Sequence, residues 1–351
     1  MPPVSGTDLT GQPIWTPPEP APPWTRPVWN SPTSSLPVFS VQGRPAPGLY
    51  AAAWVLSVFG LLLFFVGYLS TPPLAGVLLM AGLLMLTIGL SSAAGYQVVV
   101  RSTRPASMFH GPSPLLVFAI QLVIVNIATL VLLVLGVAVT GNGAAFIISS
   151  VVLLAGYILV VWLFGIRTGA LDLRGLGLPI GSSVARWLTD IGFGALTLVI
   201  SAVVVAIWGG LIASLLNSTT PDVVPAPTTS LETLFVLLGA CLLIPIGEEL
   251  LFRGYALTAW LRDLGPRAAL IRSALFFGLV HILNILVPAQ SGAALDGAKQ
   301  ALLEFLVIAP VGFVLGWVYL RRGLVASIAG HAAFNLFGLL TLLLYQSTSI
   351  R

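Results

Sequence analysis

The stretch LFVLLGACLLIPIGEELLFRGYALTAWL, residues 234–261, decides the class of this chain and contains its most informative polar residues. It is apolar enough for a membrane-spanning helix, yet it includes the adjacent glutamates Glu248 and Glu249, followed by Arg253. A charged side chain at membrane depth costs at least about 2.5–3.5 kcal/mol on insertion scales. Charged residues that are retained despite this cost indicate a functional site.

Composition identifies the rest of the chain as membrane protein. Hydrophobic residues make up 57% and charged residues 7% of 351 residues, and the mean hydropathy is +1.03. This balance predicts an all-α, polytopic transmembrane helical bundle. About nine apolar stretches can span a hydrocarbon core, near residues 49–70, 74–97, 114–140, 144–166, 187–216, 231–259, 268–287, 301–320 and 324–345.

The basic residues predict the orientation of the helices. With a cytoplasmic N-terminus and nine alternating spans, thirteen of the fifteen Lys and Arg face the cytoplasm, and only Lys299 and Arg351 do not. This is the bias of the positive-inside rule. The net charge of +4 therefore reflects topology, and we expect no nucleic-acid partner. The preference for Arg over Lys indicates a high-GC genome, hence a bacterial cytoplasmic membrane.

The chain divides into four regions. Thirteen of the 26 prolines lie in residues 1–48, which predicts a disordered, Pro-rich cytoplasmic tail because such a segment buries too little apolar surface. Residues 49–166 form four accessory helices and residues 167–186 a cytoplasmic loop. Residues 187–345 form the core that contains the polar residues.

Helical spacing separates the two glutamates. Each residue of an α-helix advances about 100°, so Glu249 and Arg253 share a face and form an ion pair. Glu248 points roughly 140° away from Arg253 and lacks this counter-ion. We therefore expect Glu249 to be structural and Glu248 to serve as a general base for water.

The later polar residues repeat the four-residue spacing. Phe277 and His281 share one face of the seventh helix, and His331 and Asn335 one face of the ninth. Counted from the cytoplasmic helix ends, Glu248 and His281 lie about 20 Å deep, Asn335 about 16 Å and His331 about 10 Å. A single cavity open to the cytoplasm can hold all four.

These three patterns resemble the motifs of a known family. E-E-x-x-x-R at 248–253, F-x-x-x-H at 277–281 and H-x-x-x-N at 331–335 are similar to those of the CPBP intramembrane proteases. This family groups CAAX prenyl endopeptidases with Abi-type and bacteriocin-processing proteins. The resemblance covers about residues 231–340 and leaves the first four helices and the tail outside it.

The resemblance implies an intramembrane endopeptidase and a role for each residue. Glu248 and His281 would activate the attacking water. His331 and Asn335 would form the oxyanion hole. Glu249 and Arg253 would support the local structure, with Phe277 packed beside the site.

Cofactor use stays open at this point. The chain has no H-E-x-x-H zinc motif. Zinc held by Glu248, His281 and His331 is one reading, since three protein ligands make an open site. We expect the metal-free reading, without any cofactor, because Asn335 beside His331 suits an oxyanion hole better than a metal shell.

Two functions other than proteolysis fit the composition. A membrane immunity or peptide-binding regulatory protein would bind a membrane peptide without cleaving it. A transporter would use buried carboxylates and histidines as a proton relay, but we find no internal repeat. The intact set of four polar residues favours a protease acting on a membrane-associated peptide or protein. With a bacterial source, we expect this substrate to be a membrane peptide other than a CAAX protein.

The charge bias predicts an extracytoplasmic C-terminus. A fluorescent protein that matures only in the cytoplasm should be dark when fused after Arg351 and bright when fused after Gly181, in the predicted cytoplasmic loop. Alkaline phosphatase fusions at the same two positions should give the reverse pattern. Bright fluorescence at both positions would contradict nine alternating spans.

Overall fold

The computed structural model describes residues 36–219, 224–283 and 294–349, and all regular structure in these ranges is helical. The all-α prediction is therefore confirmed. Residues 1–35 of the predicted tail lie outside the described residues.

Five helices precede the segment quoted above. They are α1 (Pro47–Leu69), α2 (Leu74–Arg101), α3 (Pro114–Val134), α4 (Gly143–Val161), which continues as the π-helical η1 (Trp162–Ile166), and α5 (Val184–Leu216).

The next helix is unbroken over Ser230–Leu264 but changes its winding four times. Its parts are α6 (Ser230–Leu238), the π-helical η2 (Gly239–Leu243), α7 (Ile244–Glu249), the π-helical η3 (Leu250–Leu257) and α8 (Thr258–Leu264). The chain ends with α9 (Pro266–Ile282), α10 (Ala294–Arg322) and α11 (Leu324–Ser349).

Eight helices among the described residues are long and apolar enough to cross a membrane. This agrees with the polytopic bundle predicted from composition, and the chain is an integral membrane protein. The remaining predicted span, the seventh at 268–287, is helical over Pro266–Ile282, and residues 284–287 lie outside the described residues. Its 17 residues extend about 25 Å, somewhat less than a hydrocarbon core of about 30 Å.

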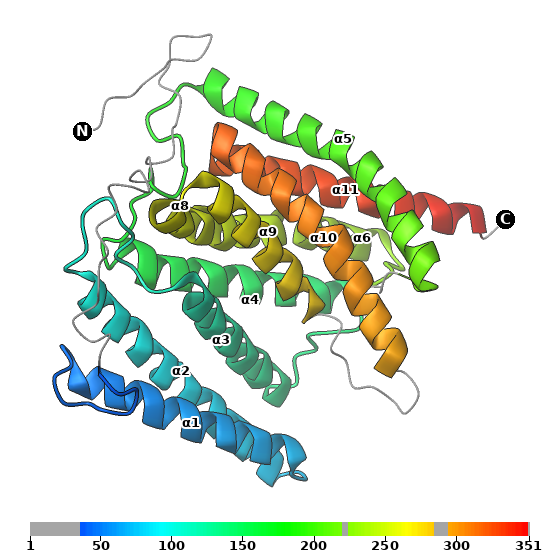
Figure 1. The fold of residues 1–351 in the computed structure, drawn as a ribbon. Coiled ribbons are helices and arrows are strands. Elements are labelled where there is room, and N and C mark those ends of the chain that lie inside the picture. Colours follow the sequence, from blue (N-terminus) through cyan, green and yellow to red (C-terminus); the bar gives the residue numbers. More distant parts are fainter. Residues whose placement is uncertain (1–35, 220–223, 284–293, 350–351) are drawn as a thin grey trace.

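The helices run side by side, and the segment with the glutamates lies in the middle (Figure 1). The α1–α2 hairpin forms one edge of the bundle. Helix α2 packs against α3, and α3 packs against α4. On the opposite edge, α5 packs against α10 and α11, while α9 packs on α10. The segment from α6 to α8 lies between these groups and contacts α4, α9 and α11.

Side-chain caps begin three of these helices. The oxygens of Asn142, Ser183 and Thr229 accept hydrogen bonds from backbone N–H groups three residues later. Such caps satisfy backbone donors that have no partner within the helix. Prolines at the first turns of α1, α3 and α9 serve the same purpose, because proline has no N–H to leave unpaired.

Glycines set the closest helix contacts. A Cβ on Gly60 would lie 2.7 Å from the backbone nitrogen of Leu86, and one on Gly82 would lie 2.6 Å from that of Phe64. These contacts join α1 to α2 backbone to backbone, as small residues allow in membranes. Between α5 and α11 a Cβ on Gly194 would lie 1.8 Å from the carbonyl oxygen of Ala326.

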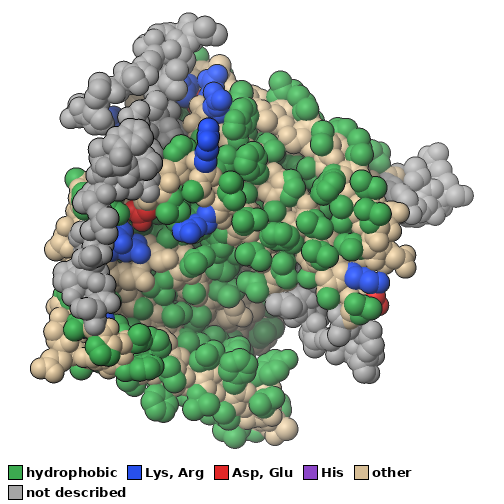
Figure 2. Space-filling view, viewed as in Figure 1, with side chains coloured by type: hydrophobic (Ala, Val, Ile, Leu, Met, Phe, Trp, Pro, Cys, Tyr) green, Lys and Arg blue, Asp and Glu red, His purple; other side chains and the backbone are tan. Residues whose placement is uncertain are grey.

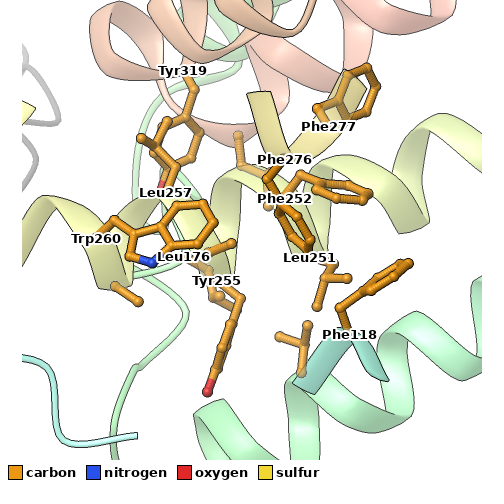
Figure 3. Close-up of a cluster of buried hydrophobic side chains, with 14 of the residues drawn as sticks. Phe118, Leu176, Leu251, Phe252, Tyr255, Leu257, Trp260, Phe276, Phe277 and Tyr319 are labelled. Atoms are coloured by element: carbon orange, nitrogen blue, oxygen red, sulfur yellow. The ribbon is translucent and has the colours of Figure 1, made fainter. Parts of the chain in front are cut away.

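Aromatic side chains form the core beside the central segment (Figure 3). The ring of Phe252 lies 5.1 Å from Phe277 and 5.2 Å from Phe276, centroid to centroid, and Phe276 contacts Phe118 and Trp260 at 5.4 and 5.6 Å. Edge-to-face and tilted contacts of this kind stabilise beyond the apolar area that they bury. This cluster fixes η3 against α3 and α9 and so positions the residues around Glu249.

The outer surface is largely apolar (Figure 2). On α5 the exposed large side chains are hydrophobic, among them Leu188, Leu196, Ile200, Ile207 and Leu211. A helix that shows such side chains outward is suited to lipid. The Lys and Arg side chains visible in this view gather mainly toward the end of the bundle where α5 begins and α10 ends.

The close approach at Gly194 generates a stability prediction. Gly194→Ala should push α5 away from α11 and cost about 1–3 kcal/mol, the usual range for overpacking. Gly192→Ala, on the same helix, is the matched control because a Cβ there meets nothing within 4 Å. Thermal melting in detergent should show a lower Tm for the first variant only. Equal Tm values for the two variants would contradict this packing.

Candidate functional site

The two glutamates lie on α7, a single short α-helical segment between two π-helical ones. Both side chains are buried: Glu249 has no exposed surface and Glu248 is 9% exposed. π-helical turns are rare, and they are frequent at functional sites. Residue spacing alone predicts uniform α-helical winding here. The structure corrects this prediction, although the predicted ion pair between Glu249 and Arg253 still forms.

The carboxylate of Glu249 is the centre of a buried network. Its Oε1 accepts hydrogen bonds from Nη1 of Arg253 at 2.5 Å and from Nδ1 of His331 at 2.9 Å. Its Oε2 accepts a hydrogen bond from the hydroxyl of Ser327. A buried carboxylate needs several donors to offset its lost hydration, and these three supply them. Glu249 therefore ties its own helix to α11.

Arg253 extends this network to a third helix. Its Nη2 donates a hydrogen bond to the carbonyl oxygen of Gly312 on α10 at 3.1 Å, and the side chain is fully buried. Its guanidinium also lies 4.2 Å from the ring centre of Phe277. This cation–π contact joins Arg253 to α9. Phe277 packs beside the site, as expected, with its ring 4.5 Å from that of His281.

Glu248 faces the two histidines. Its Oε2 lies 3.9 Å from Nε2 of His281 and 3.8 Å from Nε2 of His331. That oxygen is buried and has no hydrogen-bond partner among the described residues. Three atoms that can accept or hand over a proton thus face one another within 3.9 Å of the Glu248 carboxylate.

The other ring nitrogens of the histidines are already bonded. Nδ1 of His281 is 2.8 Å from the carbonyl oxygen of Phe277, and Nδ1 of His331 is 2.9 Å from the Glu249 carboxylate. Both partners can only accept a hydrogen bond, so both Nδ1 atoms must carry the proton. With this tautomer, a neutral imidazole presents an unprotonated Nε2 to Glu248, and a doubly protonated one presents an N–H. The backbone and Glu249 thereby fix the tautomers.

Asn335 is placed differently from the other three predicted catalytic residues. Its Nδ2 donates a hydrogen bond to the carbonyl oxygen of Ala240 on η2 at 2.8 Å. The bond fixes the amide against the helix that also carries Glu248, eight residues further along. The second N–H of the amide is left for another acceptor.

Three polar residues outside the motifs are also buried in the helices. Asp190 is fully buried, with its Oδ2 2.7 Å from Nε of Arg186. Glu304 is 8% exposed within α10, which extends from Ala294 to Arg322. Ser327 donates a hydrogen bond from its hydroxyl to the Glu249 carboxylate.

A metal site needs at least three ligand side chains that converge on one point. Carboxylate and imidazole atoms are suitable zinc ligands. Within the ranges that the structure describes, however, no group of three His, Cys, Asp or Glu is arranged to hold a metal ion. We therefore derive no step through a metal.

Comparison with known proteins identifies one family. Residues 230–337 match the family described as Type II CAAX prenyl endopeptidase Rce1-like. The match runs from α6 into α11 and includes every site residue singled out from the sequence. The resemblance to the CPBP/CAAX protease family is confirmed for this segment, and α1–α5 lie outside it. No match was found among curated proteins or among solved structures.

The network predicts that the two glutamates differ in their effect on stability. Glu249→Gln should leave the buried charge of Arg253 uncompensated, which typically costs about 3–5 kcal/mol. Glu248→Gln keeps the shape of the side chain, and Oε2 of Glu248 has no hydrogen-bond partner among the described residues, so the protein should stay folded. Melting curves of the purified variants check this, and Arg253→Ala should resemble Glu249→Gln. Equal destabilisation by both glutamate substitutions would contradict the different roles.

Proposed function

Because residues 230–337 form a domain of the type II CAAX prenyl endopeptidase family, we propose that this integral membrane protein is an intramembrane endopeptidase. It hydrolyses a peptide bond of a membrane-associated peptide or protein. The observation that carries this proposal is the position of Glu248, whose Oε2 lies within 3.9 Å of Nε2 of both His281 and His331.

Glu248 and His281 activate the water in this proposal. A water between Oε2 of Glu248 and Nε2 of His281 donates one hydrogen bond to each acceptor. Glu248 takes one proton as the water oxygen attacks the carbonyl carbon of the substrate. The tetrahedral intermediate then collapses, Glu248 returns the proton to the leaving nitrogen, and the C–N bond breaks. The second proton of the water stays on the new carboxyl group of the product, which faces His281.

His331 and Asn335 stabilise the oxyanion in this proposal. Because Nδ1–H of His331 donates to Glu249, the ring can donate through Nε2 only in its doubly protonated form. Glu249 is the counter-ion suited to that form. Asn335 offers the N–H that is not bonded to Ala240. Donors held in place before the reaction cost no reorganisation when charge develops, which is why they accelerate acyl transfer.

The arrangement of Glu248 and the two histidines supports a metal-free reaction. The two Nδ1 hydrogen bonds and the buried, unpaired Oε2 of Glu248 are sufficient for a base and an orienting group. We therefore assign no cofactor.

The topology follows the charge bias. We place the N-terminus and the 167–186 loop in the cytoplasm and the C-terminus outside, in a bacterial cytoplasmic membrane. The accessory helices at 49–166 flank the core at 187–345 through α4, which contacts α6 and α7. We therefore propose that the partner of this protein is a substrate peptide in the same membrane.

The test is proteolysis by purified variants. The substrate is found first, by comparing new peptide termini in membranes of cells that express the wild type or Glu248→Gln. A synthetic peptide that spans the strongest Glu248-dependent cleavage site then serves as substrate. Glu248→Gln should lower kcat at least about 100-fold because it removes the general base. Asn335→Ala should lower it roughly 100- to 1000-fold as a lost oxyanion donor.

The result also separates the enzyme from a binding protein. Full activity in Glu248→Gln, or no Glu248-dependent cleavage at all, would refute the protease and leave a membrane immunity or regulatory protein. A folded, inactive Glu248→Gln that still binds the peptide would support the assignment of Glu248 as the base.

A further inference from the structure

A second buried carboxylate lies near the site and has no role in the mechanism above. Glu304 lies ten residues into α10, about 15 Å from the start of the helix, and is 8% exposed. Among the described residues it forms no ion pair with Lys or Arg. The lysine on the same helix, Lys299, is 4.0 Å from Asp296 instead. An ionisable side chain buried in an apolar helix indicates a function with a specific partner.

The packing of α9 against α10 places Glu304 level with His281. The two helices are antiparallel, and a Cβ on Gly278 would lie 2.9 Å from Cβ of Ala309 and 3.1 Å from Cδ2 of Phe305. His281 lies three residues after Gly278 on α9. Because α10 runs in the opposite direction, the same step on α10 leads from between Phe305 and Ala309 back to the level of Glu304. The register thus places Glu304 and His281 at the same level of two packed helices.

The charges agree with this register. Glu304 and His281 interact electrostatically. The ring of His281 has two further contacts. Its Nδ1 is bonded to the carbonyl oxygen of Phe277, and its Nε2 lies 3.9 Å from Oε2 of Glu248. The imidazole therefore interacts with two carboxylates from two different helices, Glu248 on α7 and Glu304 on α10. One of them contacts the reacting water in the proposed mechanism, and the other does not.

We propose that Glu304 is a positioning residue that acts through His281, an inference that rests on the proposed hydrolytic function. As the second O–H of the attacking water polarises toward Nε2, positive charge develops on His281. The nearby carboxylate stabilises that charge, as a carboxylate behind a catalytic imidazole does in other hydrolases. When the product acid ionises, its proton passes to Nε2, and the charge of Glu304 balances the imidazolium until the proton is released to water.

The test compares Glu304→Gln with two reference variants, using the synthetic cleavage-site peptide as substrate. Glu304→Gln keeps shape and removes charge, so kcat should fall about 10- to 100-fold, the usual effect of losing a carboxylate that supports a functional histidine. KM should change less than about twofold, since Glu304 does not touch the substrate. Tm should be unchanged or higher, because removing a buried charge relieves its desolvation. Glu304→Asp should recover part of the activity.

Asp296→Asn is the matched control, because it removes the same charge from the same helix at a side chain that is 74% exposed. It should leave kcat unchanged. Wild-type kcat in Glu304→Gln, or a loss that follows a lower Tm without recovery in Glu304→Asp, would overturn the inference. If Glu304→Gln fails to fold, Glu304→Leu, which keeps the volume without a polar group, replaces it under the same criteria. An inactive Glu248→Gln beside a fully active Glu304→Gln would refute this inference alone, whereas an active Glu248→Gln would refute the proposed function.

Discussion

The buried carboxylate of Glu249 is the interaction on which the rest of the site depends. It holds Arg253, His331 and Ser327 at once, and Arg253 passes the constraint to Gly312. The central helix, α10 and α11 are thus fixed around one charge. Breaking such a network leaves an unpaired ion in a medium that cannot solvate it, so the arrangement is stable only when every member is present.

This constraint also explains how two adjacent glutamates acquire different properties. Glu249 points into the network and is saturated with donors. Glu248 points toward the histidines, and its Oε2 has no hydrogen-bond partner in the described part of the chain. The π-helical segments on either side of α7 change the direction of successive side chains from that of a regular helix. A saturated carboxylate maintains structure, and an unsaturated one can take a proton from water.

Much of this could be predicted from residue types and spacing. The Glu249–Arg253 pair follows from a four-residue separation, and the membrane-spanning helices follow from long apolar runs. The depth estimate placed Glu248 and His331 about 10 Å apart, yet their side chains lie 3.8 Å from each other. Helices do not begin in one plane: the start of α11 is tied to the loop at 167–186 by the hydrogen bond from Leu324 N–H to the Gly177 carbonyl. A count along one helix cannot contain that information.

By itself, the sequence determined that the chain is a helical membrane protein and which polar residues lie in its apolar helices, because the cost of burying charge leaves few alternatives. Only the tertiary structure decided which partners those residues have. It placed Ser327 and His331 on Glu249, tied Asn335 to Ala240, and brought Glu304 to the level of His281. These contacts join residues up to 95 positions apart, so they depend on how helices cross and on their register. Spacing within one helix fixes a face, whereas the packing of several helices fixes what that face meets.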